Sequence, residues 1–227
     1  FGFDLDNYDE LFSEKLELLL KIRESTNVTW SGRHRAPLTG QGVYPRALQN
    51  PLPVWIGVGG TPQSVIRAGR LGLPLMIAII GGQPGPFRQL TDLYRRAGAE
   101  AGHPPEKLIV GIHNIGFLAD TNEQAREIFW PAYRDAFGKI GKERGWPAPT
   151  RPQFDAQVSP HGALAVGDAD TVAEKIIREH ELLGGFSRLT ILLDNRQLTH
   201  AQIMRAIELL GTKVAPIVRK AVAAVQN

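Results

Sequence analysis

The turn Gly59-Gly60-Thr61-Pro62-Gln63-Ser64 combines residue types that can bind a phosphate group. Two glycines let the backbone bend sharply and approach a ligand without a Cβ atom in the way. Thr61 is a favoured N-cap and Pro62 a favoured first helical residue, so a helix is expected to begin here. Its N-terminus would offer free N–H groups, and the hydroxyls of Thr61 and Ser64 could both donate to phosphate oxygens. The alternative is an ordinary capped turn, in which Thr61 bonds only to the backbone of Ser64.

Other polar residues stand near the expected strand ends, but none defines a reaction. His113 could be a general base near neutral pH or a hydrogen-bonded core residue, and Asn114 follows it. In Asp194-Asn195-Arg196, the arginine could pair with an anionic ligand or with Asp194. The histidines form no His-Glu-X-X-His motif, cysteine is absent, and no Gly-X-Ser-X-Gly motif occurs, so metal, thiolate and serine-hydrolase chemistry have no support. We therefore assign no catalytic residue and no metal ligand.

The elements that position the turn read as apolar strands alternating with helices. Strands are expected at 54–58, 73–80, 108–117 and 189–193, and the intervening helices at 61–72, about 87–102, from 121 onward, 168–184 and from 199 onward. Strands that are apolar throughout are typical of a parallel sheet covered by helices. An amphipathic helix is expected at 8–24, whereas 27–53 reads as loop because its prolines and glycines exclude a long helix. Residues 120–167 look like an inserted segment that could form a lid or a pocket wall.

Four parallel strands make half of a (β/α)8 barrel, and an open half-barrel would leave two bare sheet edges. The expected fold is therefore a TIM-like barrel that lacks its N-terminal strands. Residues 1–227 are expected to form a single domain, because no linker divides them. The chain does not begin with Met, which fits a processed or truncated product.

The composition excludes several classes of protein. The 227 residues are 43% hydrophobic and 22% charged, and the longest apolar run is too short to cross a bilayer. The net charge of +3 comes from basic residues scattered among acidic ones, which argues against nucleic-acid binding. The N-terminus carries acidic residues where a signal peptide would carry basic ones. With no cysteine, these features favour a cytoplasmic protein.

Several motifs together resemble the bacterial-luciferase-like, flavin-dependent monooxygenase family. The longest is Val54-Trp55-Ile56-Gly57-Val58-Gly59-Gly60-Thr61-Pro62-Gln63-Ser64, followed by Ala68-Gly69 and Gly72-Leu73-Pro74. Others extend the resemblance over essentially the whole chain in the expected order: Phe1-Gly2-Phe3, Trp30-Ser31-Gly32, Tyr44-Pro45-Arg46, Gln49 to Pro53, and Val166-Gly167-Asp168 with Val172 to Ile176.

The resemblance implies a luciferase-like barrel that binds FMN or, in one branch, the deazaflavin F420. By position, Thr61 and Ser64 match the hydroxyl pair that holds the flavin phosphate, Gly59 and Gly60 form the turn, and Ile79 matches a residue that lines the flavin ring. The basic residues that complete the phosphate grip and the residues that stabilise the flavin–oxygen adduct come mainly from strands that this chain lacks.

The function implied is FMN-dependent monooxygenation of a small organic substrate by O2 and reduced flavin. The flavin would be reduced by a separate flavin reductase or directly by NAD(P)H, and a homodimer is usual for the family. Two alternatives stay open. One is an F420-dependent oxidoreductase of the same fold that transfers hydride, and the other is a catalytically silent flavin-binding fragment.

Overall fold

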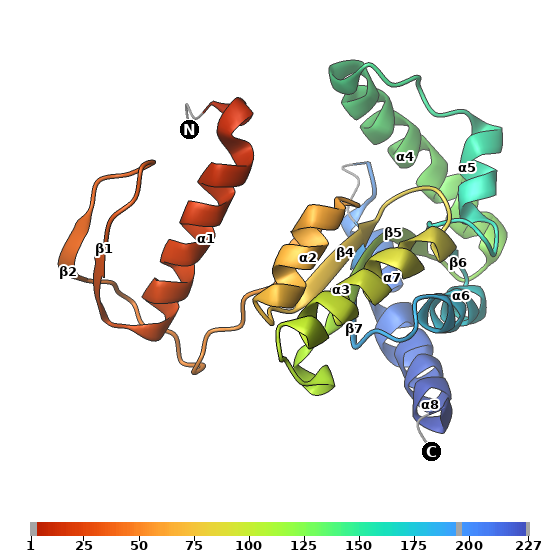
Figure 1. Ribbon diagram of the computed structural model, residues 1–227. Helices are drawn as coiled ribbons and strands as arrows, with labels where there is room; N and C mark the ends of the chain where they lie inside the picture. Colours follow the sequence, from red (N-terminus) through yellow and green to blue (C-terminus); the bar gives the residue numbers. More distant parts are fainter. Residues whose placement is uncertain (1–3, 194–196, 226–227) are drawn as a thin grey trace. The chain divides into compact units, whose positions relative to one another are not determined.

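The computed structural model describes residues 4–193 and 197–225 of the chain. The chain forms two compact units, residues 1–54 and residues 55–227, and each is described by itself (Figure 1). The expectation that 1–227 is a single domain with an insert at 120–167 stays a prediction. Within the described residues, no helix is both long and apolar enough to cross a bilayer.

The first unit consists of a helix and a β-hairpin. A short 3-10 turn, Leu5–Asn7, precedes α1 (Tyr8–Glu24), whose bounds match the predicted amphipathic helix. The predicted loop that follows is wrong in part, because β1 (Asn27–Trp30) and β2 (Leu38–Gly42) pair in antiparallel fashion. The prolines and glycines of this stretch exclude a helix but leave room for short strands. Alternate side chains of β1, Val28 and Trp30, are buried against Leu18, so the hairpin follows the period-two rule of a half-buried strand.

A parallel sheet forms the centre of the second unit. The four predicted strands are confirmed as β3 (Ile56–Val58), β4 (Leu75–Ile79), β5 (Val110–Leu118) and β7 (Arg188–Leu192), paired in that order and all parallel. A short fifth strand, β6 (Ala165–Gly167), was not predicted and pairs with the last three residues of β5. Three residues are too few to show a periodic pattern in the sequence.

Helices connect and cover the strands. Between the first three strands lie α2 (Pro62–Arg70) and α3 (Arg88–Glu100), with 3-10 turns at Gly85–Phe87 and Pro105–Lys107. Figure 1 shows α2 and α3 side by side, and a Cβ atom at Gly69 would lie 2.6 Å from the backbone oxygen of Tyr94. The close approach explains this glycine. The remaining helices are α6 (Ala169–Leu182), α7 (His200–Leu209) and α8 (Ala215–Val225), with one π-helical turn at Leu210–Val214.

Residues 120–167 are mostly helical, and the helix predicted from 121 onward is confirmed. They form α4 (Asn122–Arg144) and α5 (Arg151–Val158). The Thr121 hydroxyl caps α4, because it accepts a hydrogen bond from the Gln124 N–H at 3.2 Å. The ring of Phe129 in α4 stacks on the ring of Phe117 in β5, with centroids 5.7 Å apart. The ring of Phe154 in α5 also packs against the Phe129 ring. This segment therefore shares its hydrophobic core with the sheet.

The sheet has one covered face and one open face. Leu75, Ile77 and Ile79 of β4 are completely buried, while the residues between them are only partly buried. Strand register places Gly57, Met76, Gly111 and Arg188 in one row, and Ala78, His113 and Thr190 in a second row toward the carboxyl ends. We call these two rows the open face, since Arg188 and Thr190 are exposed and His113 is half-buried.

Candidate functional site

The Gly59–Ser64 turn follows the carboxyl end of β3 and begins α2. Gly60 has a φ of 142°, which side-chain-bearing residues rarely adopt, so glycine is required by the backbone there. A Cβ atom built at Gly59 or Gly60 would meet no atom within 4 Å. These glycines are therefore not explained by packing against the described residues, and the space beside them is open to a ligand.

Thr61 occupies the N-cap position of α2, but its side chain makes no capping hydrogen bond. Its behaviour differs from that of the other hydroxyl and carboxylate N-caps of this unit. In each of those, the side chain accepts from the backbone N–H three residues on: Thr121, Thr150, Asp168 and Thr199. The ordinary capped turn considered above is thus not what the structure contains. The Thr61 hydroxyl is exposed and has a free capacity to donate, and the first N–H groups of α2 lack intrahelical acceptors.

A second glycine pair lies at the end of the neighbouring strand. Gly81 and Gly82 follow β4, Gly82 has a φ of 77°, and neither would crowd a Cβ atom. The carbonyl of Gly82 accepts a hydrogen bond from the Ala163 N–H at 3.1 Å, which ties this loop to the segment before β6. Two adjacent strands therefore end in open glycine turns at the edge where barrel enzymes bind their ligands.

Ile79, the predicted ring-lining residue, lies on the covered face with no exposed surface. The next residue, Ile80, is 43% exposed, and Ala78 belongs to the open face. Side chains of a strand alternate between faces, so neighbouring positions differ in direction. The role of Ile79 stays a prediction, and Ile80 is the aliphatic side chain at this strand end that a ligand can reach.

The two polar residues of β5 face opposite ways. The His113 ring, on the open face, contacts Thr190 through Nδ1, 2.7 Å from Oγ1. Asn114, on the covered face, is buried and donates to Glu179 Oε2 at 2.8 Å. Asp194, Asn195 and Arg196 lie outside the described residues.

Lys175 and Glu179 of α6 are two buried titratable residues, one helical turn apart, that the sequence interpretation missed. Lys175 is 6% exposed and its Nζ donates to the carbonyls of Leu164 at 2.6 Å and Ser159 at 2.8 Å, with two longer bonds to α5. Burial lowers the pKa of Lys175 to about 8, and burial raises the pKa of Glu179 to about 7. The signal was present: Val172, Lys175, Ile176 and Glu179 share one helical stripe, so two charges stand at core positions.

Glu179 should make the stability of the protein depend on pH. Its pKa is raised from 4.5 to about 7, so the folded state binds this proton more tightly than the unfolded state. The stabilisation that protonated Glu179 contributes is complete below pH 4.5 and is lost as the pH rises to about 7. The lowered pKa of Lys175 affects stability only between about pH 8 and 10.5, so it does not interfere in this range. Between pH 4.5 and 7 we expect wild type to lose roughly 3 kcal/mol relative to Glu179→Gln, by urea unfolding. If the free energy of unfolding changed with pH in the same way in both proteins, the raised pKa assigned to Glu179 would be wrong.

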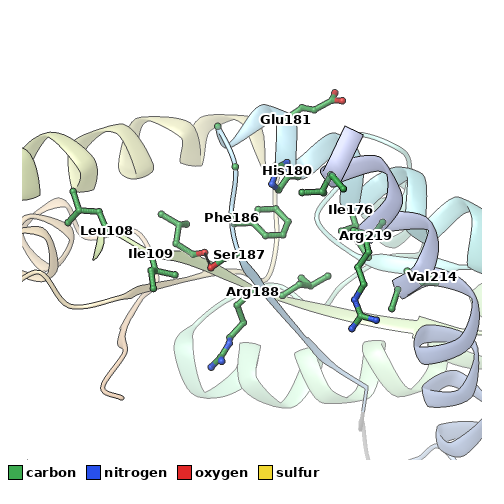
Figure 2. A pocket seen from close by; sticks show the side chains of 18 of the residues that line it. Leu108, Ile109, Ile176, His180, Glu181, Phe186, Ser187, Arg188, Val214 and Arg219 are labelled. Atoms are coloured by element: carbon green, nitrogen blue, oxygen red, sulfur yellow. Dashed lines mark hydrogen bonds between the residues drawn. The ribbon is translucent and has the colours of Figure 1, made fainter. Parts of the chain in front are cut away.

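An apolar groove of about 1140 Å3 lies elsewhere, beside the amino end of β7 (Figure 2). Ile176 of α6, Phe186 and Val214 line it, with Arg219 of α8 and Glu181 at its rim. None of the residues predicted to bind the cofactor lines this groove. Ligands of barrel enzymes bind at the carboxyl ends of the strands, so the groove is at the wrong end of the sheet for the cofactor.

Comparison with known proteins identifies the family. A sequence model of the luciferase-like monooxygenases matches residues 1–185. The chain therefore belongs to the luciferase-like monooxygenase family, as its motifs indicated.

Solved structures agree in fold. The monooxygenase RslO1 from Streptomyces bottropensis superposes with a TM-score of 0.79 at 21% identity, over 94% of this chain and 62% of its own. A second similar structure is the oxygenating constituent of 3,6-diketocamphane monooxygenase from Pseudomonas putida, a type II Baeyer-Villiger monooxygenase in complex with FMN. Its TM-score is 0.66 at 21% sequence identity, over 92% of this chain and 63% of its own. A coenzyme F420-dependent tetrahydromethanopterin reductase from Methanopyrus kandleri superposes with a TM-score of 0.63 at 18% sequence identity, over 90% of this chain and 62% of its own.

These similarities confirm the predicted fold class, a luciferase-like TIM-type barrel of which this chain contains part. The chain spans 62 to 63% of the length of these structures. It also spans 65% of a 24% identical protein, y4vJ, from Sinorhizobium fredii. Among the residues that the structure describes, the open face and the unpaired edges of the sheet have the geometry of an incomplete barrel.

Proposed function

We propose that this chain is part of an FMN-dependent monooxygenase and that the Gly59–Ser64 turn binds the FMN phosphate. The observation that carries the proposal is the Thr61 hydroxyl, which occupies an N-cap position without capping its helix. An N-cap hydroxyl that is not used for the helix is available for a ligand. The open space at Gly59 and Gly60 lets a phosphate approach the backbone closely.

The residues present fit the phosphate end of a flavin and part of its ring site. With the phosphate at the start of α2, the ring would lie over the open face of the sheet, where Ala78 is small and Ile80 offers an exposed aliphatic surface. Bound flavin supplies the redox chemistry with O2, and the protein must position it and exclude water. The wall formed by α4 and α5 shares the core of the sheet, so we assign it a fixed shape rather than the movement of a lid.

A substrate, O2 and either a flavin reductase or NAD(P)H complete the proposed reaction, and a homodimer is the proposed assembly. The alternative cofactor is F420, because the superposed reductase from Methanopyrus kandleri depends on it. The phosphate turn suits either cofactor, since both carry a phosphate on the chain attached to the ring.

Titration of the purified chain with FMN and, separately, with F420 tests the proposal. We expect FMN fluorescence to be quenched in a saturable manner and FMN to bind more tightly than F420. Tighter binding of F420 would support hydride transfer instead. If neither cofactor bound at millimolar concentration, the turn would not be a cofactor site in this chain.

A further inference from the structure

We propose that His113, oriented by Thr190, contacts the flavin ring directly. The inference rests on the proposed function, because the ligand is the flavin whose phosphate the Gly59–Ser64 turn binds. His113 would then be a residue of the reaction site contributed by this part of the barrel.

The register of the sheet places His113 where a ring would lie. Its row on the open face consists of Ala78, His113 and Thr190, on neighbouring strands. Adjacent strands are about 4.8 Å apart, so His113 on β5 is about 10 Å across the sheet from the turn that follows β3. A ribityl chain separates the phosphate of FMN from its ring by a comparable length. Ala78, on the strand between them, carries only a small side chain.

The row of the open face next to that of His113, on its amino-terminal side, is filled by side chains that contact one another. The guanidinium of Arg188 lies 4.7 Å from the centroid of the Trp55 ring, a cation–π contact. A Cβ atom at Gly111 would lie 2.8 Å from Met76 Cε and 3.0 Å from the Trp55 ring, so side chains already occupy this level. A ligand on the open face therefore rests at the level of His113.

The hydrogen bonds of His113 leave one ring nitrogen for a ligand. Nδ1 is 2.7 Å from Thr190 Oγ1, and the same hydroxyl lies 3.5 Å from the Ile112 carbonyl. In residues 4–193 and 197–225, no hydrogen-bond partner is found for Nε2. A buried core histidine would have both nitrogens satisfied. The half-buried ring, fixed on one side and open on the other, has the geometry of a group that meets a ligand.

Three substitutions test the inference by FMN titration and by the visible absorption spectrum of bound FMN. His113→Leu should weaken FMN binding about tenfold, the loss expected for one hydrogen bond to a polar ring. It should also return the bound-FMN spectrum toward that of free FMN. Thr190→Val should produce a smaller change of the same kind, and Thr190→Ser should retain wild-type behaviour because it keeps the hydroxyl.

His200→Leu serves as the matched control, since His200 is an exposed histidine at the start of α7 and should leave both readouts unchanged. A protein that binds FMN but shows the same affinity and spectrum in His113→Leu as in wild type would overturn this inference and leave the phosphate site intact. Failure of the wild-type chain to bind FMN would instead overturn the proposed function, and this inference with it.

Discussion

Replacing Lys175 with methionine is expected to lower the free energy of unfolding by about 3 to 5 kcal/mol. The buried ammonium satisfies backbone carbonyls between α5 and β6, and it lies beside the carboxyl group of Glu179. Methionine is similar in length but donates no hydrogen bond. The carbonyls of Ser159 and Leu164 would be left without this donor, and Glu179 without its neighbouring cation.

Urea unfolding followed by circular dichroism measures this loss, with Lys142→Met as the matched control. Lys142 is exposed on α4, so the same chemical change there should shift stability by less than about 0.5 kcal/mol. A double variant, Lys175→Met with Glu179→Leu, should recover part of the loss because no buried charge remains. A loss in Lys175→Met as small as that of the control would contradict the role assigned to this lysine.

The double substitution Thr61→Ala, Ser64→Ala is expected to weaken FMN binding about a hundredfold or more. Each hydroxyl would donate to a charged phosphate, and such bonds contribute about 1.5 to 3 kcal/mol each. Stability should hardly change on loss of the Thr61 hydroxyl, because that hydroxyl makes no capping bond. The expected result is thus a binding defect in a normally folded protein.

Thr199→Ala provides the opposite pattern as a control. Thr199 accepts from the Gln202 N–H at 3.3 Å, and the Gln202 side chain accepts from the Thr199 N–H at 2.8 Å. Loss of this capping box should cost about 1 kcal/mol of stability and leave FMN affinity unchanged. If Thr199→Ala and the double variant Thr61→Ala, Ser64→Ala showed the same change in FMN affinity and the same change in stability, the distinction between the Thr61 and Thr199 hydroxyls would be wrong.

The sequence predicted the architecture well where local signals were strong. The apolar strands with glycine ends, and the helix that begins after Thr199, lie where expected because each signal is contained within a few residues. The hairpin of β1 and β2 was missed, since proline and glycine suppress a helix pattern without excluding short strands. β6 was missed because its pairing with β5 depends on residues about fifty positions away.

The site was predictable in type but not in detail. The turn residues follow from their chemistry, whereas the unused hydroxyl of Thr61 appears only in three dimensions. The exposure of Ile80 rather than Ile79 depends on which face the helices cover, and an apolar run does not state this. The pairing of His113 with Thr190 joins residues far apart in sequence, so only the register of the sheet brings them together.

The most direct test of the central claim compares FMN with riboflavin, which lacks the phosphate, in wild type and in the double variant Thr61→Ala, Ser64→Ala. We expect wild type to bind FMN at least about a hundredfold more tightly than riboflavin, and most of this preference to disappear in the variant, since the phosphate and the two hydroxyls interact. Riboflavin affinity should be the same in both proteins. A preference for FMN that survived unchanged in the variant would show that the phosphate binds elsewhere and that the Gly59–Ser64 turn is only a helix start.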